Sequence, residues 1–253
     1  MASCSAPHND GGGRASVRRR QSLTRVRGSF PWIQRVIGVQ ANKMTPTASR
    51  APGQFILFSG HMIDAADRKE PRFPPGVEGV AAGAIAAALA ELNASASDIG
   101  ITEGACGGDL LFSEALLARG ASLELRLPFR QAEFIEKSVA FAKKTPPPDR
   151  WLERFRKVAR HERVTVREMP DEADLPTAED PYEQCNLWML RDALTHGAKR
   201  ASIICLWNGS GGDGPGGTAH MMKSVEDAGG RSIWLDTSRL WGKPIRARAS
   251  ARS

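Results

Sequence analysis

The sequence predicts an α/β protein with a doubly wound, mainly parallel, Rossmann-like sheet of about six strands and helices on both faces. Short apolar or alternating segments recur after residue 53, and segments with apolar residues at helical spacing lie between them. Two glycine-rich segments, 104–109 and 209–217, each stand where an expected strand leads into an expected helix. No internal repeat is found, and one domain accounts for this pattern within the 253 residues.

The expected strands are of two kinds. Residues 54–59 read Gln-Phe-Ile-Leu-Phe-Ser and are followed by glycine, which is typical of a buried parallel strand. Residues 163–168 alternate Val164 and Val166 with polar side chains, which favours an edge strand. The six expected strands cover residues 54–59, 99–102, 122–127, 163–168, 202–207 and 232–235.

Helices are expected between these strands. Ile85 and Leu89 recur at helical spacing after a proline-rich loop, and Trp151, Phe155 and Val158 form one face of a later helix. The expected helices lie near residues 76–92, from the 103–109 turn through 117, near 131–142 and 150–160, at 181–196, and from the second glycine segment to 227.

The positive charge is concentrated at the two ends of the chain. The formal net charge is +7, but residues 1–50 hold nine Lys/Arg and one acid, and residues 243–253 hold four basic residues and no acid. Residues 51–242 therefore hold 22 Lys/Arg against 27 Asp/Glu, a net charge of −5. We expect a disordered basic arm over 1–50, a Rossmann-like ligand-binding domain over 51–241, and a basic tail over 242–253.

Several interpretations of the arm stay open. Arg18-Arg19-Arg20 suggests a twin-arginine signal, but the segment that follows is poorly hydrophobic. The Arg/Ser bias also fits a transit peptide, and the charge of residues 14–50 fits a nucleic-acid-binding arm. Met44 is an alternative start, in which case residues 1–43 are not part of the expressed protein.

Composition excludes several classes of protein. No window approaches the ~18 apolar residues of a membrane span, so no membrane partner is expected. Cys4, Cys106, Cys185 and Cys205 form no CxxC pair, which argues against a disulfide scaffold and favours a cytoplasmic setting. No metal-ligand spacing is present, and no cofactor is identified.

Ligands of open α/β sheets bind beyond the carboxyl ends of the strands, where both glycine segments are expected. Glycine lets the backbone approach a ligand closely, and free N–H groups at a helix start attract phosphate. The first segment is neither a dinucleotide fingerprint nor a P-loop. The second segment has six glycines in nine residues. It is interpreted as a ligand-binding loop, with a flexible surface loop as the alternative interpretation. The candidate ligand-binding residues are Gly60, His61, Gly104, Cys106, Gly107, Gly108, Asp109, Arg130, Ser210, Gly214, Gly216, Gly217, Thr218 and His220.

Some of these residues have competing roles. Asp109 is expected to cap the helix that follows it, with contact to a ligand ribose as the alternative. Asp64 is expected to orient the ring of His61, and His220 either contacts a ligand or covers its loop. Cys106 is interpreted as a small pocket-lining residue rather than the nucleophile of a strand–turn–helix elbow.

Acidic residues supply the candidates for catalysis. A carboxylate at the end of a strand can accept ribose hydroxyls or polarise a water, and the candidates for acid/base work are Glu103, Asp109 and Asp213. Tyr182, Glu183 and Asn186 share one helix face that could reach the site.

Two motifs resemble a known family. Ala105-Cys-Gly-Gly-Asp-Leu-Leu111, with Glu114 three positions on, resembles the early glycine turn of the SLOG superfamily. These Rossmann-like proteins include DprA and the LONELY GUY phosphoribohydrolases. Gly214-Pro-Gly-Gly-Thr218 is similar to the superfamily's later P-G-G-x-G-T loop, but one residue shorter. The resemblance covers about residues 54–238 and keeps the order of the two loops.

The resemblance implies a pocket for nucleotides or nucleotide-derived ligands and, as in several members, sensing beside an effector. Phosphoribohydrolases of this type carry a catalytic Glu shortly after the second loop. Here Thr218 is followed by Ala219 and His220, and the next acid is Glu226, so the catalytic Glu is not matched.

We therefore expect binding or sensing of a nucleotide-like small ligand, with an effector protein and a homo-oligomer as possible partners. The first alternative is a nucleotide hydrolase that uses the same pocket to cleave an N-glycosidic or a phosphoester bond. The second is nucleic-acid binding through residues 14–50, which the acidic body disfavours.

Overall fold

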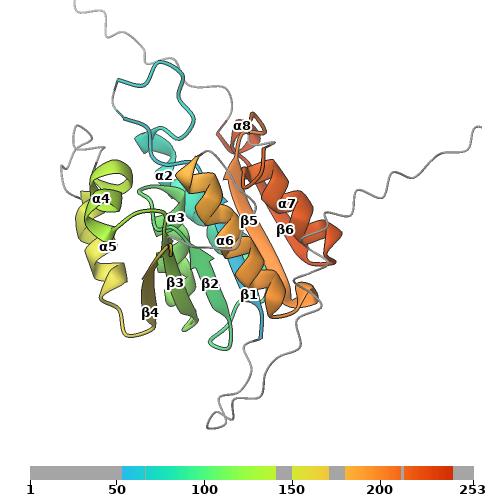
Figure 1. Cartoon of the computed structure of the whole chain (residues 1–253). Coiled ribbons are helices and arrows are strands. Elements are labelled where there is room, and N and C mark those ends of the chain that lie inside the picture. Colours follow the sequence, from blue (N-terminus) through green and yellow to red (C-terminus); the bar gives the residue numbers. More distant parts are fainter. Residues whose placement is uncertain (1–52, 66, 141–149, 171–179, 212–213, 242–253) are drawn as a thin grey trace, which may run out of the picture.

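The computed structural model describes residues 53–65, 67–140, 150–170, 180–211 and 214–241, and confirms the predicted α/β fold (Figure 1). Each expected strand is present, with bounds that differ by one residue at most. The strands are β1 (Phe55–Gly60), β2 (Ile99–Thr102), β3 (Ser122–Leu127), β4 (Val164–Glu168), β5 (Ala201–Trp207) and β6 (Arg231–Asp236).

The helices alternate with the strands. The main helices are α2 (Glu78–Glu91), α3 (Gly108–Leu117), α5 (Arg150–Ala159), α6 (Pro181–Thr195) and α7 (Thr218–Asp227). The shorter helical segments are the 3-10 turns η1 (Pro75–Val77) and η3 (Ala198–Arg200), the π-helical turn η2 (Ile135–Val139), α4 (Gln131–Phe134) and α8 (Thr237–Leu240).

The single helix expected over 131–142 is the one clear departure among these elements. It consists of α4 and η2, and residues 141–149 lie outside the described part of the chain. The π-helical turn carries Ser138, whose backbone oxygen accepts the Cys106 N–H at 2.9 Å. The Ser138 hydroxyl lies 2.7 Å from the Tyr182 hydroxyl. These two tertiary contacts, which the local sequence does not reveal, accompany the change in helical pitch.

All neighbouring strands are parallel, in the order β4-β3-β2-β1-β5-β6. β1 is central and pairs with β2 on one side and β5 on the other, so that Phe55 lies between Ile99 and Ala201. The chain runs outward from β1 to β4 and then crosses back to β5. The strand order therefore reverses between β1 and β5, which places a ligand crevice at their carboxyl ends.

The sheet separates two apolar cores. Ile56 and Phe58 of β1 pack into the core that α2, α3 and α5 cover, whereas Phe55 and Leu57 face α6 and α7. The alternation of side chains along β1 produces this division. No helix among the described residues is long and apolar enough to cross a membrane.

The segment after β1 lies directly against the turn before α3. The N–H of Ile63 donates to the Cys106 oxygen at 3.0 Å, and the N–H of Gly108 donates to the His61 oxygen at 3.1 Å. Gly107 has φ +107°, and a Cβ added there would lie 2.5 Å from the Ile63 nitrogen. Only glycine allows this approach, which fixes His61 relative to the start of α3.

Replacing Gly107 by alanine is therefore expected to lower the free energy of unfolding by about 2 kcal/mol or more, from positive-φ strain and the backbone overlap. Gly83→Ala is the matched control, because an added Cβ at this exposed α2 position meets no atom within 4 Å. That control is expected to gain up to about 1 kcal/mol from helix propensity. Urea denaturation measures both, and equal effects would contradict the close packing.

Candidate functional site

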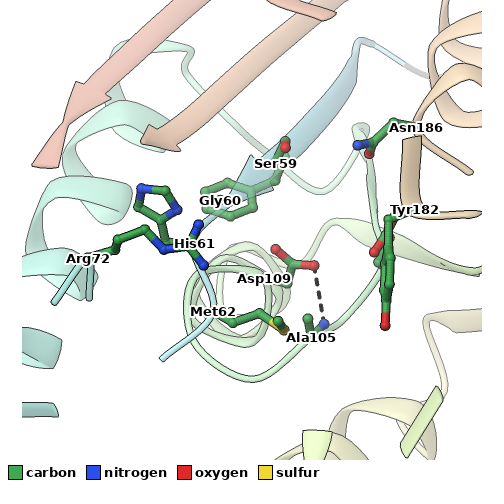
Figure 2. A pocket seen from close by; sticks show the side chains of 11 residues that line it. Ser59, Gly60, His61, Met62, Arg72, Ala105, Asp109, Tyr182 and Asn186 are labelled. Atoms are coloured by element: carbon green, nitrogen blue, oxygen red, sulfur yellow. Dashed lines mark hydrogen bonds between the residues drawn. The ribbon is translucent and has the colours of Figure 1, made fainter. Parts of the chain in front are cut away.

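Two adjoining hollows lie at the carboxyl ends of β1, β2 and β5, where the strand order predicts a ligand site. Their volumes are about 250 and 230 Å³, and they share Gly60, His61, Arg72, Tyr182 and Asn186. We call the larger one the first hollow; it is also lined by Phe58, Ser59, Met62, Glu103, Ala105 and Asp109 (Figure 2). The second hollow is also lined by Glu183, Leu206, Trp207, Ser210, Gly217 and Thr218.

The first glycine segment does not hold its amides free for a phosphate. The Asp109 carboxylate turns back over the segment, and its Oδ2 accepts the N–H groups of Gly104 at 3.1 Å and Ala105 at 3.2 Å. The N–H of Cys106 donates to Ser138, and that of Gly108 donates to His61. The protein's own carboxylate thus occupies the place in which an anionic ligand was expected.

The predicted capping role of Asp109 is wrong. Gly107 is the N-cap of α3, and Asp109 is the second residue of the helix. Burial raises the pKa of Asp109 to about 7, although hydrogen bonds from Ala105 and Gly104 act in the opposite direction. Asp109 lines the first hollow, so the carboxyl both organises the turn and faces the ligand space (Figure 2).

Glu103 is a buried carboxyl in the wall of the first hollow. It follows β2 directly and is 8% exposed. Its Oε1 is buried and accepts no hydrogen bond from any described residue. Burial, followed by the negative charges of Asp109 and Asp180, raises the pKa of Glu103 well above its usual range. The first hollow therefore contains two carboxyls whose ionisation is suppressed.

His61 lies in both hollows as a neutral imidazole. Burial, reinforced by the positive charge of Arg72, lowers the pKa of His61 to about 4. Its Nε2 accepts the N–H of Asn208 at 3.3 Å, so the neutral ring carries its proton on Nδ1.

The predicted pairing of Asp64 with His61 is wrong. Asp64 instead holds the loop that follows, because its Oδ2 accepts the backbone N–H groups of Arg72 at 2.8 Å and Phe73 at 2.9 Å. Its Oδ1 pairs with Arg68 at 3.3 Å.

Arg72 is a site residue that the sequence analysis missed. It lines both hollows, and its buried Nε has no hydrogen-bond partner among the residues that the structure describes. Burial is the main cause that lowers the pKa of Arg72. The Asp64 carboxylate anchors the backbone of Arg72 and of Phe73, and the Phe73 ring is fully buried and stacks on Trp241. The available signal was an arginine among prolines in the loop after β1.

The second glycine segment packs against α6. Gly216 has φ +81°, and a Cβ there would lie 2.0 Å from the backbone oxygen of Glu183. The Asn186 side-chain amide donates to the Gly216 oxygen at 2.9 Å, and the Gly216 N–H donates to Nδ1 of His220 at 3.1 Å. His220 therefore secures the loop, and burial lowers its pKa.

This packing brings the start of α7 to the end of β1. The hydroxyls of Ser59 and Thr218 lie 3.3 Å apart, and Thr218 lines the second hollow together with Gly217. Thr218 and Gly217 were both predicted as ligand-binding residues. The first amides of α7 have no intrahelical acceptor, so this end of the helix favours an anion.

Other predicted residues lie apart from the two hollows. Cys106 is completely buried in the core, and burial raises its pKa, so it has neither the exposure nor the acidity of a nucleophile. Gly107 and Gly108 serve the packing of the turn. Arg130 is exposed at the start of α4 and lines neither hollow, and Asp213 lies outside the described residues.

Helix α6 contributes the remaining polar groups. Tyr182, Glu183 and Asn186, expected on one face, all reach the hollows. Within the described ranges, no group of three or more His, Cys, Asp or Glu side chains could hold a metal ion.

The lowered pKa of His61 predicts a stability change in acid. The folded protein prefers the neutral ring, so this contribution is complete above the unfolded pKa of about 6.5 and is lost as pH falls toward about 4. Between pH 7.5 and pH 5, we expect His61→Asn to lose about 2 kcal/mol less of its free energy of unfolding than the unmodified protein loses. Denaturant unfolding at both pH values measures this, and identical losses would contradict a buried neutral histidine.

Gly216→Ala is expected to lower the free energy of unfolding by about 2 kcal/mol or more, because the added Cβ would overlap the α6 backbone. Gly214→Ala in the same loop is the matched control, since its Cβ would come no closer than 3.9 Å to Glu183. Thermal unfolding of the two variants tests whether the loop packs against α6. Equal melting temperatures of the two variants would show that it does not.

Comparisons with known proteins assign no family. A scan against protein-family models gives no match, and a search of curated proteins gives none. The six-stranded parallel sheet is Rossmann-like, but many unrelated functions use such sheets. Functional inference for this chain therefore depends on the residues of its own site.

Proposed function

We propose that the protein binds a nucleotide or nucleotide-derived ligand in the two adjoining hollows and acts as a ligand-sensing module. The observation that carries this proposal is Arg72, a guanidinium with a buried, unpartnered Nε among the described residues, in the wall of both hollows.

An anionic group is the ligand chemistry that this arrangement favours. The Nε of Arg72 is withdrawn from water without a hydrogen-bond partner among the described residues, which is unfavourable, and a phosphate offers the planar guanidinium two oxygens. Gly217 and Thr218 at the start of α7 line the second hollow, which Arg72 also lines. The positive end of the helix would therefore act on the same anion as Arg72.

The remaining features favour a small ligand over a polyanion. Residues 51–242 carry a net charge of −5, so attraction is local to Arg72 and α7 and does not spread over the domain. The hollows are lined by hydroxyl and amide groups of Ser59, Tyr182 and Asn186, which suit the polar edges of a sugar or base. The resemblance of the two glycine loops to the SLOG superfamily supports nucleotide chemistry and a sensory role beside an effector.

A second candidate function is hydrolysis of the ligand's N-glycosidic bond. The observation that favours it is the pair of carboxyls in the first hollow with raised pKa values, Glu103 and Asp109. In such a reaction the C–N bond breaks and the base leaves with a proton from Glu103. A water oxygen bonds to C1′ of the sugar, and a proton of that water passes to the Asp109 carboxylate.

The ligand proposal is tested by thermal shift and calorimetry against nucleoside mono-, di-, tri- and cyclic phosphates and ADP-ribose. At least one ligand is expected to raise the melting temperature. Arg72→Gln should weaken its binding by about 10-fold or more, because a charge-assisted contact is lost. Arg130→Gln is the matched control: this arginine is exposed outside the hollows, and its removal should change affinity less than about 2-fold.

Absence of any shift across the panel would overturn the proposal, as would equal effects of the two arginine substitutions. Chromatography of the same mixtures separates binding from turnover. Release of free base by the unmodified protein, abolished in Glu103→Gln, would favour the hydrolase. Intact ligand after prolonged incubation would favour the ligand-sensing function.

A further inference from the structure

We propose that Glu103 recognises the sugar of the bound ligand, and that this carboxyl makes the first hollow selective for ribose over 2′-deoxyribose. The inference rests on the proposed function and adds the chemical class of sugar that the site accepts.

The position of Glu103 supplies the first part of the argument. It immediately follows β2, at the edge of the sheet where parallel strands present ligand contacts. The side chain is 8% exposed and lines the first hollow. It is therefore withdrawn from bulk water but in contact with the space that a ligand would fill.

The hydrogen bonding around Glu103 supplies the second part. The neighbouring turn is organised by Asp109, whose Oδ2 already accepts the N–H groups of Gly104 and Ala105. Glu103 takes no part in this turn. The Cys185 thiol hydrogen-bonds to its carboxyl group, but its Oε1 has no donor in the described part of the chain. A buried carboxyl oxygen without a donor is unfavourable, so the missing donor is assigned to the ligand.

The charges around Glu103 decide which kind of donor fits. Asp109 and Asp180 act on it as negative charges, and the Tyr182 hydroxyl and Cys185 thiol approach it from α6. Such surroundings, together with burial, keep the carboxyl neutral, with one accepting and one donating oxygen. A vicinal diol donates and accepts hydrogen bonds, which complements this group, whereas a cationic amine requires the ionised form.

Arg72 fixes which end of the ligand reaches Glu103. Both side chains line the same hollow of about 250 Å³, and Figure 2 shows Arg72 and Tyr182 on opposite sides of Asp109. A ligand whose phosphate pairs with Arg72 extends its sugar into the remainder of this hollow. The 2′- and 3′-hydroxyls of a ribose are then the donors available to Glu103.

The experiment measures dissociation constants by calorimetry for the ribonucleotides of the panel, each beside its 2′-deoxy counterpart. The unmodified protein should bind the ribose form about 10-fold or more tightly than the deoxy form. Glu103→Met keeps the length of the side chain but removes both oxygens. It should weaken binding of the ribose form alone, reducing the preference below about 3-fold.

Glu103→Gln is the conservative control. It retains one acceptor and one donor and should preserve the preference to within about 3-fold. Melting temperatures verify that both variants fold. If Glu103→Met does not fold, equal binding of the ribose and deoxy forms by the unmodified protein would still refute the proposal, and a ribose preference would support it.

Four results would overturn the inference. Equal binding of ribose and deoxy forms, with Arg72 still required, would refute sugar recognition and leave the proposed function intact. A Glu103→Met variant that retains the preference would assign the sugar to another residue. Equal weakening of both forms by Glu103→Met would give the carboxyl a different contact, such as a base amine. No binding by any nucleotide would overturn both proposals.

Discussion

The contact on which the site depends is the pair of hydrogen bonds from Gly104 and Ala105 to the Asp109 carboxylate. The carboxyl group of Asp109 accepts the N–H groups of the turn before α3, so this glycine-rich segment forms a wall of the site and does not offer its amides to a phosphate. The close approach at Gly107 then locks the end of β1 against the same turn. Together these contacts place His61, Glu103 and Asp109 around the first hollow. The Glu103 side chain takes part in none of them.

The resulting site is electrostatically divided. Arg72 lies in the wall of both hollows, and the start of α7 borders the second, so an anion is favoured there. Glu103 and Asp109 line the first hollow and resist ionisation because both are buried, and the charges of Asp109 and Asp180 add to this effect on Glu103. Neutral His61 contributes hydrogen-bonding capacity without charge. A ligand with a phosphate at one end and hydroxyls at the other complements this division.

The sequence was sufficient to predict the fold and the position of the site where local patterns of residues determine the structure. The apolar segment of β1 and the alternating valines of β4 identify strands, and strand–turn–helix order identifies the crevice and the role of Thr218 as a lining residue. The sequence was insufficient where hydrogen bonds from backbone amides to a side chain determine the shape of a loop. Arg72 reaches the site because Asp64 binds the loop amides, and Asp109 turns back instead of capping, which its position beside a helix start does not reveal.

The most direct test of the account is a crystal structure with the tightest-binding ribonucleotide. We expect phosphoryl oxygens within about 3.2 Å of the Arg72 guanidinium and a ribose hydroxyl within about 3.2 Å of Glu103 Oε1. Asp109 should remain bonded to Gly104 and Ala105. A phosphate bound on the amides of 104–108 with Asp109 displaced, or a ligand outside both hollows, would contradict the account.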